Sequence, residues 1–79
     1  MIHFKENIIV DDEVLGFIFT PVQVSSGEKC FVAVYKRNNK IASFDIKTDK
    51  AGNWKILQPA PDWIRDLEDK LRSVIRSHA

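Results

Sequence analysis

The sequence predicts an α+β fold: an antiparallel β-meander of four to five strands with one C-terminal amphipathic helix packed on one face of the sheet. Short apolar segments alternate with turn-forming clusters up to about residue 58, which is typical of strands joined by hairpins. Beyond that point, apolar residues recur at spacings of three and four, which is typical of a helix. A length of 79 residues suits one domain. We therefore expect a single domain over 1–79, with strands within 2–58 and the helix at about 61–77.

The hairpin with Asn38-Asn39 at its tip sets the expected register, because Asn tolerates the left-handed backbone of a two-residue type I′ loop. Side chains alternate between the two faces of a strand, so the residues paired by this loop share a face. The pairs on the expected inner face are Tyr35 with Ala42, Ala33 with Phe44, and Phe31 with Ile46.

A three-residue loop at Asp11–Glu13 and a turn at Ser26-Gly27 extend this register toward the N-terminus. The expected inner face comprises Ile2, Phe4, Ile8, Val10, Val14, Ile18, Val22, Phe31, Ala33, Tyr35, Ala42, Phe44 and Ile46, joined by Trp54 and Ile56 from a short fifth strand. Glu6 does not fit this face and indicates an edge or a bulge. Pro21 cannot donate to a β-ladder, so we expect a kink or bulge at Thr20-Pro21.

The helix is expected to begin after Pro59-Ala60-Pro61, since proline suits the first helical position. Its apolar stripe comprises Ile64, Leu67, Leu71, Val74 and Ile75. Trp54 and Trp63 flank the proline-containing connection. We interpret them as anchors between helix and sheet in preference to a groove for an extended peptide.

This register leaves a second apolar surface that one helix cannot cover. We take it as a candidate interface, comprising Leu15, Phe17, Phe19, Val32, Val34 and Ile41. Monomers seldom expose large apolar patches. The expected function is therefore a non-catalytic interaction or self-associating module, which would form a homodimer or bind a protein partner. Two alternatives remain: the sheet curls enough to bury both faces, or the kink at Pro21 turns Phe17 and Phe19 inward.

Charge gives little support for nucleic-acid binding. The 12 basic and 11 acidic residues are interspersed along the chain, and the formal net charge is +1. An alternative is weak nucleic-acid binding through the basic hairpin at 35–40, where Tyr35 adjoins Lys36 and Arg37. Tyr35 is expected in the core, however, and Asp45 and Asp49 dilute the charge, so this alternative is disfavoured.

No catalytic, metal or cofactor signature is present, and neither an enzyme nor a small-molecule ligand is indicated. His3 and His78 lie near opposite ends of the sequence and have no ligand spacing. Cys30 has no histidine nearby in sequence and is expected to be a partly buried filler. Asp11-Asp12-Glu13 lacks the pattern of a calcium loop. A ligand carrier or enzyme with a pocket between helix and sheet remains a third alternative.

The expected compartment is the cytoplasm. Cys30 is the only cysteine, so no intramolecular disulfide can form. Charges at Lys5 and Glu6 interrupt the N-terminus before any apolar stretch of signal-peptide length. No apolar segment reaches about 18 residues, so we expect no membrane-spanning helix.

Overall fold

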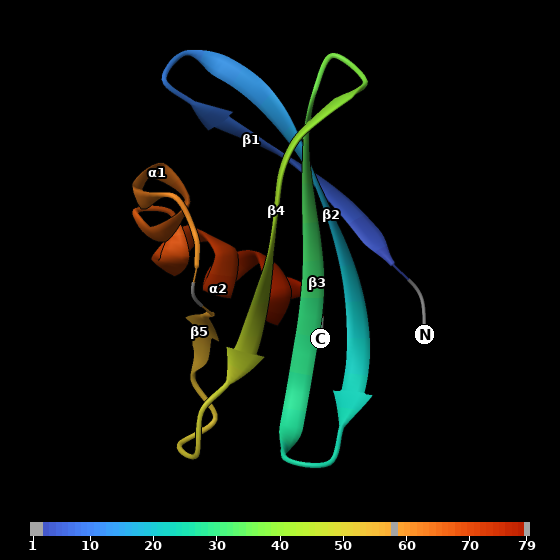
Figure 1. Ribbon diagram of the computed structural model, residues 1–79, viewed down its shortest axis with the longest axis vertical. Coiled ribbons are helices and arrows are strands. Elements are labelled where there is room, and N and C mark those ends of the chain that lie inside the picture. Colours follow the sequence, from blue (N-terminus) through green and yellow to red (C-terminus); the bar gives the residue numbers. More distant parts are fainter. Residues whose placement is uncertain (1–2, 58, 79) are drawn as a thin grey trace.

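The fold is a curled, five-stranded antiparallel sheet with helical segments at its C-terminal end (Figure 1). A computed structural model describes residues 3–57 and 59–78. The strands, which neighbour one another in chain order, are β1 (Phe4–Val10), β2 (Glu13–Val24), β3 (Gly27–Lys36), β4 (Asn39–Thr48) and β5 (Trp54–Ile56). The predicted antiparallel meander is thus confirmed. Ile2, expected on the inner face, lies outside the described residues.

The predicted single helix at 61–77 is wrong: the structure contains two short helices, α1 (Asp62–Arg65) and α2 (Glu68–Ser77). Asp66 and Leu67 separate them, and Leu67 has φ −92° and ψ 3°. Its N–H donates to the carbonyl of Ile64 three residues earlier at 3.0 Å, which tightens the chain at the break. The predicted apolar stripe still provides buried residues from both helices. These are Ile64, Leu71, Val74 and Ile75.

All three hairpin loops between β1 and β4 are shorter or earlier than expected. The turn expected at Ser26-Gly27 lies at Ser25-Ser26, because Val24 pairs with Gly27. Asp11-Asp12 joins β1 to β2 with φ values of 49° and 65°, and Arg37-Asn38 joins β3 to β4 with φ values of 50° and 70°. Both are two-residue loops in which both residues are left-handed, as a type I′ turn requires. The expected turn chemistry is therefore present, but the loop that was expected at Asn38-Asn39 lies one residue earlier.

Because side chains alternate along a strand, a one-residue slip moves every side chain of a strand to the other face. In β3 and β4, Val34 pairs with Ala42 and Val32 with Phe44. The register shifts at Ile41, a β-bulge between the pairs Tyr35–Lys40 and Val34–Ala42. The expected pairing of Tyr35 with Ala42 is wrong by one residue.

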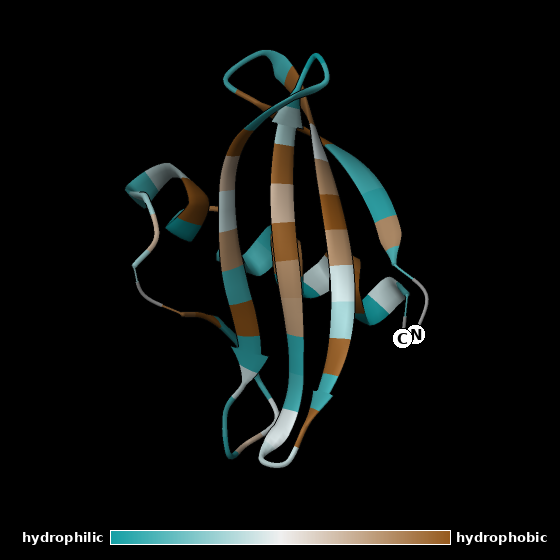
Figure 2. Ribbon diagram, turned by 45° about the vertical axis from the view of Figure 1, so that its right-hand side comes forward, coloured by the Kyte–Doolittle hydropathy of each residue, from teal (hydrophilic) through white to brown (hydrophobic). Residues whose placement is uncertain are grey.

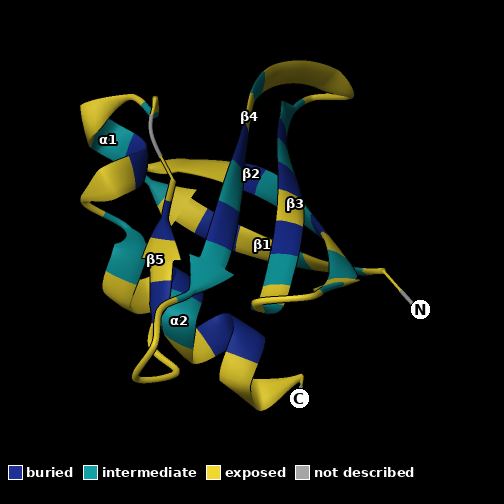
Figure 3. Cartoon of the chain, turned by 60° about the horizontal axis from the view of Figure 1, so that its bottom comes forward, coloured by how far each residue is buried: buried dark blue, intermediate teal, exposed yellow. Residues whose placement is uncertain are grey.

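Because of the one-residue differences at the β1–β2 and β3–β4 loops, β2 and β3 bury the face that was expected to be uncovered. β1, β4 and β5 bury the expected face. The buried strand residues are Ile8, Leu15, Phe17, Phe19, Cys30, Val32, Val34, Phe44, Ile46, Trp54 and Ile56. Together with the helix residues, they form one core cluster between the sheet and the helices (Figure 3). Of the expected inner residues, Val14 is 61% exposed and Phe31 45% exposed. Ile18, Val22, Ala33 and Tyr35 are half-buried.

Pro21 causes no kink or bulge, contrary to expectation. It pairs with Cys30 in a β2–β3 register that runs without interruption from Gly16 to Val24. In an antiparallel strand, successive backbone groups point alternately to the two neighbouring strands. The nitrogen of Pro21 points toward β1, which begins at Phe4 opposite Phe19. The ring therefore removes no hydrogen bond between β2 and β3.

The two edges of the sheet are treated differently. At β5, the Ile56 N–H donates to Glu68 Oε2 at 2.9 Å, and Arg72 Nε donates to the Trp54 carbonyl at 2.6 Å. Arg72 also pairs with Glu68 at 3.0 Å. These α2 side chains satisfy backbone groups that face away from β4, so the outer edge of β5 is covered.

At β1, no hydrogen bond from another described element reaches the outward-facing backbone of Lys5, Asn7 or Ile9. The strand is regular at Glu6, which was expected to mark an edge or bulge, and β1 is indeed an edge strand. Glu6 lies 3.6 Å from His78 Nε2, and the His78 ring stacks on Phe4 with centroids 4.0 Å apart. The end of α2 therefore rests on the start of β1.

Candidate binding face

Five of the six residues of the predicted interface lie in the core, so they cannot form an open surface of this fold. Leu15 is 4% exposed, Val32 1%, and Phe17, Phe19 and Val34 0%. Ile41 alone of the six is exposed, because it is the bulged residue of β4. The expectation failed because the register was displaced at the loops on either side of β2 and β3. The inward position of Phe17 and Phe19 owes nothing to Pro21.

The face of the sheet that the helices leave uncovered is therefore the opposite one, here called the outer face. It is turned toward the viewer in Figures 1 and 2, with α2 behind the strands. Strand alternation and the register assign its residues. They are Lys5, Asn7, Ile9, Val14, Gly16, Ile18, Thr20, Val22, Lys29, Phe31, Ala33, Tyr35, Lys40, Ser43, Asp45, Lys47, Lys55 and Leu57.

Basic side chains gather on the outer face. Lys29 pairs with Lys47, and Lys47 pairs with Lys55, so three lysines form a row across β3, β4 and β5. Lys5 and Lys40 lie elsewhere on the face. Arg37 stands at the tip of the β3–β4 hairpin. Among the described residues that we assign to this face, Asp45 is the one carboxylate. The near-neutral chain therefore carries a basic surface, which folding assembles from residues far apart in sequence.

An aromatic ring lies at the centre of this basic face. Phe31 is 45% exposed, and the Lys29 Nζ lies 4.8 Å from the centroid of its ring. The same ammonium lies 3.4 Å from Asp45 Oδ2. The carboxylate and the ring thus hold Lys29 in place. Exposed contacts of this kind contribute on the order of 1 kcal/mol or less each.

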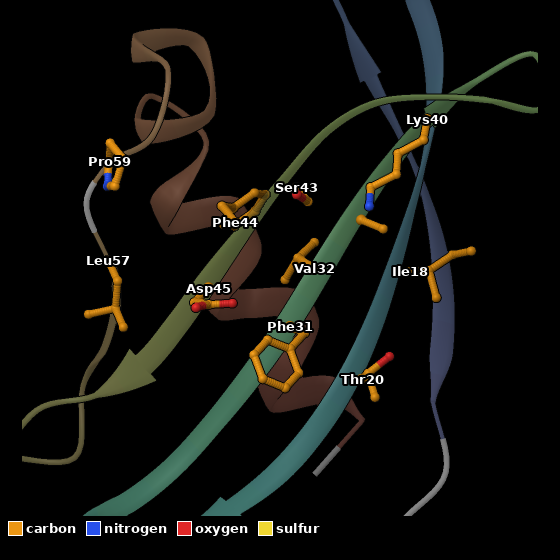
Figure 4. A pocket seen from close by; sticks show the side chains of 11 residues that line it. Ile18, Thr20, Phe31, Val32, Lys40, Ser43, Phe44, Asp45, Leu57 and Pro59 are labelled. Carbon is orange, nitrogen blue, oxygen red and sulfur yellow. The ribbon is translucent and has the colours of Figure 1, made fainter.

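A shallow open hollow surrounds Phe31, with a volume of about 470 Å³ (Figure 4). Ile18 and Thr20 from β2 form one side, and Leu57 and Pro59 form the opposite side. The Lys40 side chain extends along the hollow toward its middle, and the Phe31 ring turns its flat side toward the opening. The hollow therefore offers an apolar floor, with the Lys40 cation at one end and the Asp45 carboxylate in its lining.

A second hollow lies beside Gly16, where the absence of a side chain leaves room above β2. The Lys5 side chain crosses this space: a Cβ on Gly16 would lie 3.0 Å from Lys5 Cε. Tyr35, Arg37 and Asn38 line the same hollow, which has a volume of about 390 Å³. In both hollows an outer-face aromatic ring lies near cationic side chains: Phe31 near Lys40 in the first, and Tyr35 near Lys5 and Arg37 in the second.

The groups considered for catalysis or metal binding form no site among the described residues. Cys30 is 1% exposed, and burial, assisted by Glu28, raises the pKa of its thiol to about 11. A thiol with this pKa is protonated near neutrality and is a poor nucleophile. His78 rests on Phe4, and His3 is exposed. No group of three or more metal-ligating side chains occurs within 3–57 and 59–78.

A cleft does occur between the sheet and the end of α2, where a ligand carrier would need one. Phe4, Cys30, Trp54, Ile75 and His78 are among the residues that line it. Its volume of about 230 Å³ is below the roughly 300–1,000 Å³ of most small-molecule sites. Trp54 and Trp63 both pack on the core cluster, consistent with their expected role as anchors.

Comparisons with known protein families, with curated proteins and with solved structures gave no match. Of the helices that the structure describes, none combines the length and apolar character needed to cross a membrane.

Sequence reasoning missed the outer face as a site, although one signal was available. Lys29 lies in phase with Phe31, Ala33 and Tyr35, whereas Cys30 lies in phase with Val32 and Val34. Cysteine is among the most frequently buried residues, and lysine is among the least. This contrast indicates which face of β3 is buried. Because the expected register put the wrong face of β3 inward, it hid the lysine row, the exposed Phe31 and the half-buried Tyr35 of the outer face.

Proposed function

We propose that this chain is a non-catalytic binding module whose working surface is the outer face of the sheet, and that its partner is a polyanion. The observation that carries the proposal is the combination of the lysine row, Lys29, Lys47 and Lys55, with the exposed Phe31 on the helix-free face. Interaction through the uncovered sheet face was the sequence-based expectation, and the proposal keeps that role on the opposite set of residues.

Charge argues against face-to-face self-association through this surface. Two copies packed on their outer faces would bring lysines from both sheets together, with Asp45 as the carboxylate available on each copy. Like charges in an interface are destabilising. A partner with repeated negative charges meets the opposite situation, because each lysine contact releases counterions from the polyanion.

Retention on immobilised heparin tests the proposal. The unmodified protein should bind at low salt, and the double variant Lys47→Glu/Lys55→Glu should elute at clearly lower salt. The matched control is Lys50→Glu/Lys70→Glu, which has the same net charge but changes exposed residues in the β4–β5 turn and on α2. Circular dichroism verifies that both variants fold.

The distinction between the two double variants decides the outcome. A polyanion site on the outer face predicts a large salt shift for Lys47→Glu/Lys55→Glu and a small one for the control. Equal shifts for the two variants, or passage of the unmodified protein through the column at low salt, would contradict the proposal.

A further inference from the structure

We infer that the polyanion bound by the outer face is a single-stranded nucleic acid, with bases stacked on Phe31 and Tyr35 and phosphates on the surrounding lysines. This inference rests on the proposed function and names its partner class. Nucleic acid was disfavoured from the sequence because Tyr35 was expected in the core and because Asp45 and Asp49 dilute the charge of the hairpin. The structure instead places Tyr35 on the outer face, where it lines the second hollow.

The spacing of the two rings favours an extended strand. Phe31 and Tyr35 are four residues apart on one face of β3, which corresponds to about 13 Å along the strand. Neighbouring stacked bases are about 3.4 Å apart in a duplex. The two rings are therefore too far apart for adjacent stacked bases, and bases that reach both rings have further nucleotides between them.

Cationic side chains lie beside each ring, within reach of the phosphates of a strand whose bases stack on the rings. Lys40 extends into the hollow around Phe31, and the ammonium of Lys29, one member of the lysine row, lies 4.8 Å from the centroid of the Phe31 ring. Lys5 and Arg37 line the hollow of Tyr35. A groove of positive charge that also offers aromatic stacking platforms is the arrangement by which proteins bind single strands with little sequence preference.

Polar side chains with short reach lie between these cations. Thr20 and Ser43 line the first hollow, and Asn7 and Asn38 line the second. Such groups can hydrogen-bond to sugars, phosphates or base edges. A duplex would offer its phosphates to the lysines but keep its bases stacked away from Phe31 and Tyr35. The outer face should therefore discriminate between single and double strands.

The test measures fluorescence anisotropy with a labelled 12-nucleotide oligothymidylate, a 12-base-pair duplex and a labelled acidic peptide of glutamates. We expect the single strand to bind more tightly than the duplex or the peptide. Phe31→Leu and Tyr35→Leu should each weaken single-strand binding by roughly tenfold. Both should leave retention on heparin unchanged, and Ile9→Ala, an exposed outer-face change without a ring, serves as the control.

One variant should increase affinity, which misfolding cannot imitate. Asp45→Asn removes the carboxylate that holds Lys29 at 3.4 Å and frees this cation for phosphate. We expect single-strand binding to tighten by severalfold and to remain strongly dependent on salt.

The possible failures separate this inference from the proposed function. Equal affinity for all three ligands, or ring variants that bind oligothymidylate like the unmodified protein, would overturn the nucleic-acid inference. Polyanion binding through the lysine row would then still stand. Failure of the unmodified protein to bind heparin at low salt would overturn both the nucleic-acid inference and the proposed function.

Discussion

The inner and outer faces of this sheet carry similar apolar residues in very different surroundings. Phe19 and Phe31 lie on neighbouring strands, β2 and β3, yet Phe19 is fully buried and Phe31 is 45% exposed. On the inner face, the described lining is apolar and the two helices complete the core. On the outer face, each ring has cations beside it. Residue type alone does not identify the core of a sheet with two apolar faces; the register does.

The largest expected difference between the two faces is in stability. Phe17→Ser removes a side chain with no exposed surface and should lower the free energy of unfolding by about 3–5 kcal/mol. Phe31→Ser, the matched change on the outer face, should cost about 1 kcal/mol or less. Urea denaturation followed by circular dichroism measures both, and Phe17→Leu gives a graded value if Phe17→Ser does not fold. Equal losses at the two positions would show that the faces are assigned wrongly.

A smaller effect is expected where the helix covers β5. Arg72→Met keeps the apolar stem but removes the donor to the Trp54 carbonyl and the pairing with Glu68, and should cost about 1–3 kcal/mol. Amide hydrogen exchange adds a local readout, because Glu68→Ala leaves the Ile56 N–H without its acceptor. Exchange at Ile56 should then accelerate. Arg76→Met, an exposed change on the same helix, is the control and should leave both readouts near those of the unmodified protein.

The smallest effect is on pH dependence and concerns Cys30 of the inner face. Burial raises the pKa of this thiol from 9.0 to about 11, so the folded state holds its proton more tightly than the unfolded chain does. This contribution to stability is fully present below about pH 9 and is lost as the pH rises toward 11. Cys30→Ala should flatten the fall in unfolding free energy over this window, relative to the unmodified protein. Parallel pH profiles for the two proteins would argue that burial does not raise the pKa of the Cys30 thiol.

The order of the elements and the turn chemistry could be predicted from the sequence, because both depend on local patterns. β1, β4 and β5 also face as expected: Phe44 and Trp54 alternate with polar neighbours, and Ile8 lies in phase with Phe4 and Val10. β2 is apolar on both sides: Leu15 and Phe17 compete with Val14 and Ile18, so alternation alone cannot choose the buried face. The choice rested on loop length, and a loop that differs by one residue reverses it.

The candidate site was less predictable than the fold, because it is built from residues that only pairing brings together. Lys29, Lys47 and Lys55 are spread over 27 positions of the sequence but stand side by side on three strands. A count of charges along the chain averages them with the acidic residues of α1 and α2. The break between the helices at Leu67 was likewise not predictable, because no proline or glycine lies there.

The covered edge of β5 and the open edge of β1 have a consequence for assembly. Sheets aggregate into fibres when each molecule can add a neighbour on both sides. In the described structure, Glu68 and Arg72 occupy one of these sides, which leaves β1 as the strand free to pair. In two molecules joined through β1, only the covered edges of β5 would face outward. Edge-to-edge growth of the folded protein therefore terminates at a pair, and a fibre requires α2 to detach first.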